Sequence, residues 1–454
     1  MNVQPLYKQK LFWPQPPKRK VGLFTDLRLF IDALEIGEKQ GEFTKPQLTE
    51  GLSNRVKGLM FIKKLSRRVI DDLIRELINF DWLEKQTKHG APGFTLTKKG
   101  KTLWLLYESD RNACTQQLII EMHQLYIIPG WFVNRLWELN PSGQGQIVIP
   151  APLPNWHPKA RKWENKEWDN ELAEQAGASI RLINKTCTGA FPIDETTWLT
   201  EVKNKWTRLS QVQPRTTAKP KKKDKKEKGK METYAPRLRL FNAMIEAAVN
   251  LLFGNKNPIT SQVDFDSEKQ PLSFRIYIAW CPRLAELGLI HYTDSHPQIP
   301  GRLIFPVSVF KSNTNSNSFV LLENITNLIG EKLFLHHPPI NEASINNFLD
   351  ILYRQHQHFY TLVKSLYVSL MDVRDEVCQQ LRISAELFDL FLKSSVLGLK
   401  SDRPHHQLYT ISLESDIRED QGGGYQKLRR PVILDGKPYS LIAMTKTERI
   451  EKHN

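Results

Sequence analysis

The feature that most constrains the fold is a helical apolar stripe that runs directly into two short strand-like segments. The stripe lies in SRRVIDDLIRELINF, residues 66–80, and its members recur with the 3.6-residue period of an amphipathic helix: Ile70, Leu73, Ile74, Leu77 and Ile78. The opposite face carries charged residues: Arg67, Arg68, Asp71, Arg75 and Glu76. WLEKQT at 82–87 and FTL at 94–96 then flank the Gly/Pro turn KHGAPG. This order predicts a helix that buries one face, followed by a β-hairpin.

Further helices are expected on both sides of this segment. TDLRLFIDALEIGEKQG, residues 25–41, is periodic and ends at Gly41, a helix stop signal. TKPQLTEGL, residues 44–52, begins with Thr44 as a cap, and Gln47 completes a capping box. After the hairpin, Thr97 is expected to cap a helix that continues through Leu106.

Three helices followed by a two-stranded hairpin is the order of a winged helix-turn-helix domain. Residues 22–106 resemble the winged-helix domains of the MarR/PadR type, and GFTLTKKGKTLW resembles the strand–Thr–x–x–Gly segment that closes them. The resemblance covers under a fifth of the chain. It implies that the third helix enters the major groove of DNA while the hairpin wing touches the flanking backbone. Winged helices also serve as protein-docking modules, so that alternative stays open.

The resemblance implies a set of DNA-contacting residues. On the third helix they are Ser66, Arg67, Arg68 and Arg75. On the wing and just beyond it they are Lys85, Lys88, His89, Lys98, Lys99 and Lys101. Arginine can fork onto guanine edges, whereas lysine serves mainly as a charge near phosphate. Asp71 and Asp72 oppose this role, because a carboxylate on the same helix repels phosphate, although it can accept a hydrogen bond from cytosine.

The charge of the chain favours an anionic partner. Its 454 residues carry a formal net charge of +15, with a pI of about 9.4. Double-stranded DNA is the first candidate, and an anionic membrane surface is the second. Apolar residues make up 40% and charged residues 25%, an ordinary globular balance. At this length the chain is expected to form several domains.

Cysteine usage and hydropathy predict a cytoplasmic protein without a membrane span. Cys114, Cys187, Cys281 and Cys378 lie far apart, and the sequence has no C-x-x-C motif. A zinc ribbon, a thioredoxin-type site and a disulfide framework are therefore disfavoured. The first 20 residues lack a signal-peptide core, and no apolar run is long enough to cross a bilayer.

The predicted fold class is mainly α with small β-hairpins (α+β), as tandem winged-helix domains joined by a basic disordered linker. The linker prediction rests on KPKKKDKKEKGK, residues 219–230, which has eight lysines and nothing strongly apolar. The expected domains are an N-terminal winged helix with a basic arm (1–125), a Trp-rich helical domain (126–215), the Lys-rich linker (216–232), a possible winged helix (233–310), an Asn/Ser linker (311–318) and a C-terminal winged-helix-like domain (319–454).

The middle region contains a second possible wing. APRLRLFNAMIEAAVNLLFG, residues 235–254, predicts an amphipathic helix. SFRIYIAWC, residues 273–281, suits a strand or a helix, with Pro282 starting a new helix. GLIHYT at 288–293 and GRLIFPVSVF at 301–310 are then expected to pair.

The C-terminal region resembles a further winged helix. Residues 344–372 are expected to form one long helix, and residues 373–383 and 384–399 a helix pair. QLYTISLE at 407–414 can pair with residues 430–444, where Asp435-Gly436 predicts a tight turn. Leu387, Phe388, Phe391 and Leu392 are expected to cover the sheet, while Glu386 and Asp389 face outward and favour protein docking over DNA. The wing keeps three basic candidates for DNA contact: Lys427, Arg429 and Arg430.

No motif predicts catalysis. The sequence lacks a phosphate-binding P-loop, a dinucleotide-binding glycine motif, H-E-x-x-H and G-x-S-x-G. Asp194, Glu201 and Lys203 match a nuclease D…E-x-K set poorly, because their spacing is short and helical. The seven tryptophans of 126–215 suit a core better than base stacking. We therefore expect a non-enzymatic protein with no cofactor or metal.

Three uses of such a protein remain open at the level of sequence. The first is a DNA-binding regulator, or the DNA-engaging subunit of a bacterial machine such as an antiviral defence or mobile-element system. The second is a scaffold whose winged helices dock an ATPase, SMC-type or nuclease partner. The third is a plasmid-type replication initiator. Protein partners are expected to bind the C-terminal domain.

Overall fold

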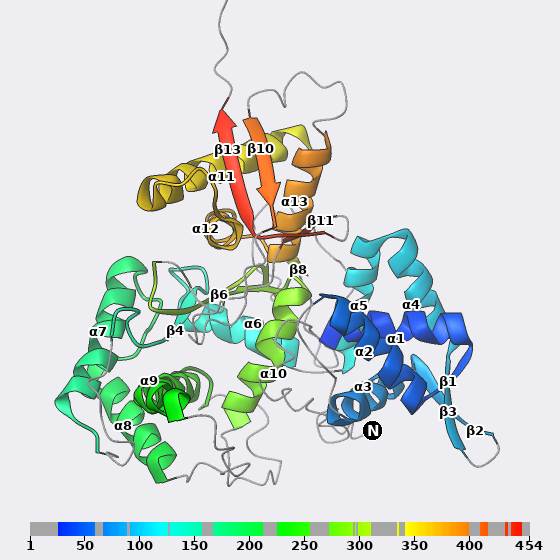
Figure 1. The fold of residues 1–454 in the computed structure, drawn as a ribbon, viewed down its shortest axis with the longest axis horizontal. Helices are drawn as coiled ribbons and strands as arrows, with labels where there is room; N and C mark the ends of the chain where they lie inside the picture. The colour runs from blue at the N-terminus through cyan, green and yellow to red at the C-terminus, as the bar shows by residue number, and fades with distance from the viewer. Residues whose placement is uncertain are drawn as a thin grey trace, which may run out of the picture. The chain divides into compact units, whose positions relative to one another are not determined.

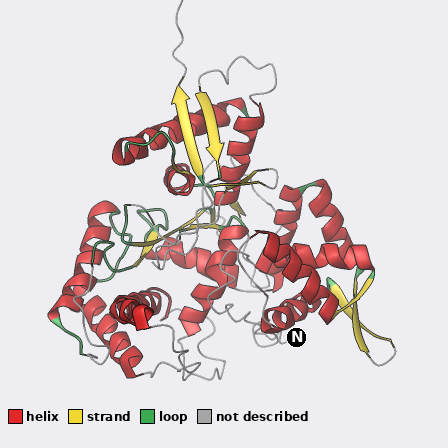
Figure 2. Cartoon of the chain, viewed as in Figure 1, coloured by secondary structure: helices red, strands yellow, loops and turns green. Residues whose placement is uncertain are grey.

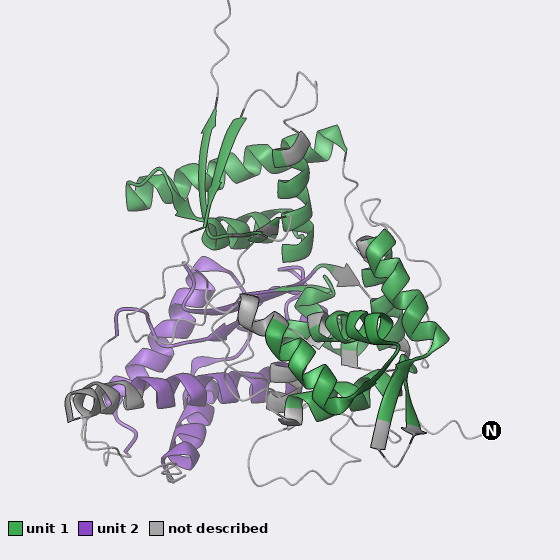
Figure 3. Cartoon of the chain, turned by 45° about the vertical axis from the view of Figure 1, so that its right-hand side comes forward, with its two compact units in different colours: residues 1–134, 278–291, 307–454 green, residues 135–277, 292–306 purple. Residues whose placement is uncertain are grey.

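The chain is mostly helical, with strands gathered in small sheets (Figure 2). The computed structural model describes residues 26–59, 67–88, 91–125, 128–156, 167–211, 225–254, 272–293, 296, 298–309, 334–335, 341–398, 409–415, 432–434 and 437–446. The chain divides into two compact units (Figure 3). Unit 1 comprises residues 1–134, 278–291 and 307–454, and unit 2 comprises 135–277 and 292–306. The predicted α+β class is confirmed, while the units divide the chain differently from the six expected segments.

The N-terminal part of unit 1 consists of helices and one three-stranded antiparallel sheet (Figure 1). Its elements are α1 (Asp26–Gln40), β1 (Glu42–Thr44), α2 (Lys45–Leu59), α3 (Arg67–Asn79), β2 (Leu83–Lys88), β3 (Ala91–Leu96), α4 (Lys98–Ser109) and α5 (Arg111–Leu125). The sheet order is β1-β3-β2, with Glu42 opposite Thr95 and Leu83 opposite Leu96. The expected helices and hairpin are confirmed, and β1 adds a third strand.

Local signals set the ends of these elements. Gly41 follows α1 with φ +71°, and its N–H donates to Gly37 O at 2.9 Å. The Thr44 N–H donates to Gln47 Oε1 at 2.7 Å, which is the glutamine half of the predicted capping box. Thr97 caps α4 as predicted, because its hydroxyl oxygen accepts from the Gly100 N–H at 3.1 Å.

Unit 2 is built around buried tryptophans. It holds the end of α6 (Ile128–Leu139) from Arg135 onward, then β4 (Ile147–Pro150), α7 (Asn170–Thr186), α8 (Glu195–Gln211), α9 (Lys225–Val249) and the π-helical turn η2 (Asn250–Gly254). Trp198 and Trp206 are fully buried, and the Trp198 indole N–H donates to Ala176 O at 2.9 Å. For these two residues the structure favours the core interpretation.

Two expectations for the middle region change. Helix α9 begins at Lys225, inside the segment whose composition predicted disorder, while residues 216–224 lie outside the described residues. Helix α10 (Leu272–Glu286) is a single helix with Pro282 inside it, so this proline does not start a new helix. Burial of Trp280 and Leu284 on either side of Pro282 favours continuing the helix despite the lost N–H.

Strand β5 (Ile290–Tyr292) and β6 (Gly301–Pro306) are neighbours in a sheet, as predicted, and β4 joins them to give the order β4-β6-β5. Ile147 lies opposite Ile304 in this antiparallel pairing. Two short strands of unit 1, β7 (Ser308–Val309) and β8 (Phe334–Leu335), form a separate pair.

The C-terminal part of unit 1 contains α11 (Glu342–Val363), β9 (Val368–Ser369), α12 (Leu370–Leu381), α13 (Ala385–Gly398), β10 (Tyr409–Glu414), β11 (Val432–Leu434), β12 (Lys437–Tyr439) and β13 (Leu441–Lys446). The sheet order is β10-β13-β9, and β11 pairs with β12 around the predicted two-residue turn, which lies outside the described residues. The expected helix over 344–372 is wrong. Helix α11 stops before Lys364, which has φ +54°, and Ser369 caps a new helix.

One connectivity occurs three times along the chain: a helix, a strand, two helices and two strands. The N-terminal copy is α1-β1-α2-α3-β2-β3, and the C-terminal copy is α11-β9-α12-α13-β10-β13 with β11–β12 inserted. The middle copy is α6-β4-α9-α10-β5-β6 with α7 and α8 inserted. In every copy the last strand is central in its sheet. The third helix of each copy, α3, α10 or α13, precedes the final two strands.

Candidate nucleic-acid interface

Helix α3 buries its apolar stripe and turns one arginine outward. Ile70, Leu73, Ile74 and Leu77 are all buried. The Arg75 side chain is 61% exposed, and its Nη2 lies 3.9 Å from Asp72 Oδ1. Arg67 and Arg68 form the first turn of α3, but their side chains, and Ser66, lie outside the described residues. Among the sequence-predicted residues of this helix, Arg75 is therefore the one whose side-chain position can be stated.

The prediction that Glu76 lies on the charged face is wrong. Glu76 is buried, and its carboxylate accepts two hydrogen bonds from Arg283, at 2.6 Å (Nη1 to Oε1) and 3.0 Å (Nη2 to Oε2). Arg283 lies 207 residues later in the chain, on α10, and belongs to the same unit. Helical periodicity reports only which residues share a face, so it could not reveal a partner supplied from so far away.

One of the two α3 carboxylates that oppose a DNA-binding role, Asp71, has a cationic partner. Asp71 forms an ion pair with Lys45, the first residue of α2. Both side chains are partly exposed, at 40% for Asp71 and 28% for Lys45. This pairing lowers the negative potential beside Arg75. Sequence analysis singled out Asp71 but missed Lys45, although Lys45 stands at a helix start where a cation has no dipole partner.

Other predicted basic residues lie on the hairpin and on α4. Lys85 is exposed on β2, in the register position opposite Phe94. Lys98 and Lys101 are exposed in the first turn of α4, directly after the hairpin. Lys88 ends β2, but its side chain and all of His89 lie outside the described residues.

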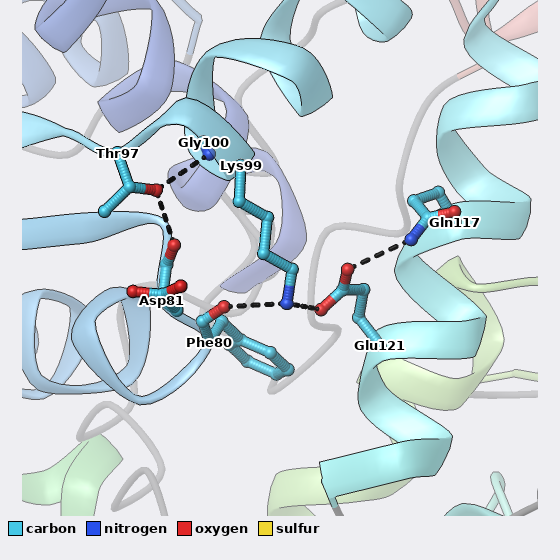
Figure 4. A network of polar contacts seen from close by, with 7 residues as sticks. All are labelled: Phe80, Asp81, Thr97, Lys99, Gly100, Gln117 and Glu121. Carbon is cyan, nitrogen blue, oxygen red and sulfur yellow. Dashed lines mark hydrogen bonds and ion pairs between the residues drawn. The ribbon is translucent and has the colours of Figure 1, made fainter.

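Lys99 is also exposed, at 43%, but its ammonium group has protein partners. Its Nζ donates to the carbonyl oxygen of Phe80 at 3.0 Å and forms an ion pair with Glu121 on α5 (Figure 4). Glu121 also accepts a hydrogen bond from Gln117 Nε2 at 3.0 Å. Lys99 therefore connects the end of α3 to α5, so it has a structural role in addition to its predicted place among the DNA contacts.

The junction between hairpin and α4 is held by its Thr–x–x–Gly segment. The Thr97 hydroxyl donates to Asp81 O at 2.5 Å while its oxygen accepts from the Gly100 N–H (Figure 4). A Cβ on Gly100 would stand 2.3 Å from the Trp82 carbonyl oxygen. Glycine at this position is what allows α4 to approach the start of the hairpin.

The third helix of the C-terminal copy is covered. Leu387, Phe388, Phe391 and Leu392 are buried as predicted. Asp389 does not face outward: it is buried, with Oδ1 3.7 Å from Arg374 Nη1. Burying a charged carboxylate away from water is costly unless a cation lies nearby, and Arg374 supplies that cation. Glu386 is partly exposed, and β11 contacts α13. Lys427, Arg429 and Arg430 lie outside the described residues.

The third helix of the middle copy is also largely buried where its side chains are described, with Pro282, Ala285 and Glu286 partly exposed. Tyr277, Trp280, Cys281, Arg283 and Leu284 of α10 are all buried. Among the described side chains of α3, α10 and α13, Arg75 is the one exposed cation.

The two acidic residues of the weak nuclease-like pattern, Asp194 and Glu201, have structural partners. Asp194 precedes α8 and accepts from the Thr197 N–H at 2.8 Å, and this hydrogen bond lowers its pKa. Glu201 lies 2.8 Å from Lys205 Nζ and accepts from Asn250. Within the described ranges, no three His, Cys, Asp or Glu side chains are grouped so that they could hold a metal ion.

No described helix is both long enough and apolar enough to span a bilayer.

Comparison with known proteins gives no relative: no protein-family model, curated protein or solved structure matches the chain.

Proposed function

We propose that the chain is a non-enzymatic protein that binds double-stranded DNA, with α3 entering the major groove and the β2–β3 hairpin lying along the flanking backbone. The observation that carries the proposal is the order α1-β1-α2-α3-β2-β3 with β3 central, combined with the outward Arg75 on the third helix. This order is that of a winged helix, in which the third helix reads base edges. By the same connectivity, we propose that the middle and C-terminal copies are also winged helices.

Electrostatics supports the assignment of roles. Exposed Lys85 on the hairpin, and Lys98 and Lys101 on α4, supply charges suited to phosphate contacts. Arg75 supplies the forked donor suited to a guanine edge. The Lys45 partner of Asp71 limits repulsion between α3 and phosphate. The net charge of +15 adds attraction that is independent of sequence.

The test is a titration of the full chain with a short mixed-sequence duplex over a range of salt concentrations. Each phosphate neutralised contributes roughly 0.9 to the magnitude of the slope of log affinity against log salt. We expect a steep slope, and we expect Arg75→Ala to weaken binding by about 1–3 kcal/mol. Lys185→Ala, at an exposed lysine on α7, is the matched control and should leave affinity nearly unchanged. Absence of binding at low salt excludes the proposed function.

A second candidate, docking of a protein partner by the C-terminal region, is favoured by one observation. Four large apolar side chains are exposed at and just after the end of α11: Tyr360, Leu362, Val363 and Leu366. The burial of most of α13 also makes this helix less suited than α3 to read a DNA groove. The double variant Leu362→Ser/Val363→Ser discriminates the two uses in the full chain. Unchanged duplex affinity supports protein docking at this end, whereas a loss places it in the DNA-binding surface.

These roles suit a regulator or the DNA-engaging subunit of a larger assembly.

A further inference from the structure

We propose that Arg283 is a positioning residue for α3. By binding Glu76, it fixes the rotation of α3 about its own axis so that the Arg75 side chain points toward DNA. This inference rests on the proposed function, because it concerns the orientation of the helix that is proposed to enter the groove. Arg283 itself is buried, so it is proposed to act through α3 and not by touching DNA.

The ion pair between Arg283 and Glu76 has a fixed geometry. Two nitrogens of the guanidinium meet the two carboxylate oxygens, at 2.6 and 3.0 Å, and both side chains are only 2% exposed. A bidentate pair of this kind restrains direction as well as distance. The apolar stripe of α3 lacks this property, since hydrophobic contact is not directional and tolerates small rotations of a helix.

The guanidinium is itself held in place by aromatic rings from two elements. Its Cζ lies 5.6 Å from the ring centre of Phe30 on α1 and 4.9 Å from that of Trp280 on α10. Both rings are buried, so the cation is desolvated and its interaction with them is strengthened. Arg283 thus has little freedom to follow α3 if the helix turns.

The position of Glu76 on α3 links this restraint to Arg75. Successive residues of an α-helix are about 100° apart around the axis, so Glu76 lies beside Arg75 at the edge of the buried face. A turn of α3 about its axis would carry both side chains together. Holding the Glu76 carboxylate therefore holds the direction in which Arg75 leaves the helix.

A purely structural ion pair would stabilise the fold without affecting DNA binding by the folded protein. The double variant Glu76→Met/Arg283→Met separates the two roles. It removes one charge of each sign, so net charge is unchanged, and replacing a buried ion pair by apolar residues of similar volume is often tolerated. The matched control is Arg374→Met/Asp389→Met, which removes the buried pair between α12 and α13.

Thermal unfolding and duplex titration are measured on the full chain for both double variants. We expect each to unfold cooperatively. The Glu76/Arg283 variant should lose between about fivefold and a hundredfold in duplex affinity, the range for one misdirected base-reading arginine. Its salt slope should stay that of the wild type, because no phosphate contact is removed. The Arg374/Asp389 variant should keep both affinity and slope.

Arg283→Lys gives a second route to the same result if the double variant fails to fold. Lysine keeps the positive charge but cannot form the two parallel hydrogen bonds of a guanidinium, so duplex affinity should again fall while the chain stays folded. Wild-type affinity in folded Glu76/Arg283 or Arg283→Lys variants overturns the positioning role, as does a change in their salt slope by about one phosphate. If the wild type itself binds no duplex, the proposed function fails instead, and the inference falls with it.

Discussion

Gly100 lies so close to the backbone of Trp82 that a Cβ would stand 2.3 Å from the Trp82 carbonyl oxygen. Three residues earlier, the Thr97 hydroxyl joins Asp81 O to the Gly100 N–H. The Thr97 cap and the close approach of Gly100 to Trp82 together pack the first turn of α4 against the start of the hairpin. The spacing Thr–x–x–Gly therefore follows from the geometry of this junction, whatever surface the hairpin contacts.

Gly100→Ala should destabilise the fold by about 1–3 kcal/mol, the usual range for forcing a methyl group into a packed interior. The contacting atom is backbone, so no side-chain rotation can relieve the overlap. The measurement is urea or thermal unfolding of the full chain. Thr102→Ala, at an exposed position on the same helix, is the control and should change stability little. An unchanged midpoint for Gly100→Ala would show that α4 does not approach Trp82 so closely.

Lys99→Met should lower stability by about 1–3 kcal/mol, because it leaves the carboxylate of Glu121, only 8% exposed, without its cation. Duplex affinity of the folded variant should match the wild type. Lys98→Met is the adjacent control: its side chain is exposed, so it should keep stability and lose affinity. Loss of DNA binding by Lys99→Met at unchanged stability would show that Lys99 acts mainly as a DNA contact and not as a link between α3 and α5.

Lys45→Met should weaken duplex binding by about 0.2–1 kcal/mol, since it leaves the Asp71 carboxylate uncompensated beside Arg75. Adding Asp71→Asn should restore most of the loss, because the repelling charge is then gone. Affinity and salt slope are measured for the single and double variants. If the double variant binds as weakly as Lys45→Met, Lys45 acts through its own contact with DNA and not by neutralising Asp71.

Glu376→Gln should change the pH dependence of stability. Burial, and then the nearby charges of Asp375 and Asp372, raise the pKa of Glu376 to about 7. Between its ordinary pKa and about 7 the folded state holds a proton that the unfolded state releases, so this residue's contribution to stability falls as pH rises through that window. The slope for one proton is at most about 1.4 kcal/mol per pH unit.

The Glu376→Gln variant should lack this dependence of stability on pH, and it should be more stable than the wild type above pH 7. Unfolding midpoints at pH 5 and pH 8 give the comparison. Asp372→Asn, which removes one of the charges that raise the pKa, should shift the window to lower pH. Parallel pH profiles for the wild type and Glu376→Gln would contradict the assignment.

Elements set by neighbouring residues could be predicted from the sequence. The apolar stripe of α3, the hairpin after it, the Thr97 cap and the stop at Gly41 depend on signals within a few residues, and the structure has each of them. The β11–β12 pairing flanks the predicted tight turn for the same reason.

Features set by distant partners could not be predicted. Glu76 is buried because Arg283 meets it from 207 residues away, and Asp389 is buried because Arg374 lies on the preceding helix. Strand β9 interrupts an apolar, helix-like run because Val368 pairs with Ile442 on β13. In each case tertiary contact outweighs the local pattern.

The pairing of Ile147 with Ile304 has a consequence for synthesis of the chain on the ribosome. Strand β4 is fully buried in the finished sheet, yet its partner β6 is made more than 150 residues later. At roughly 5–20 residues per second, about eight to thirty seconds pass between the synthesis of β4 and that of β6. During this interval the apolar side chains and unpaired backbone of β4 are open to other nascent chains. Prematurely terminated products that end before β6 should therefore aggregate or be held by chaperones.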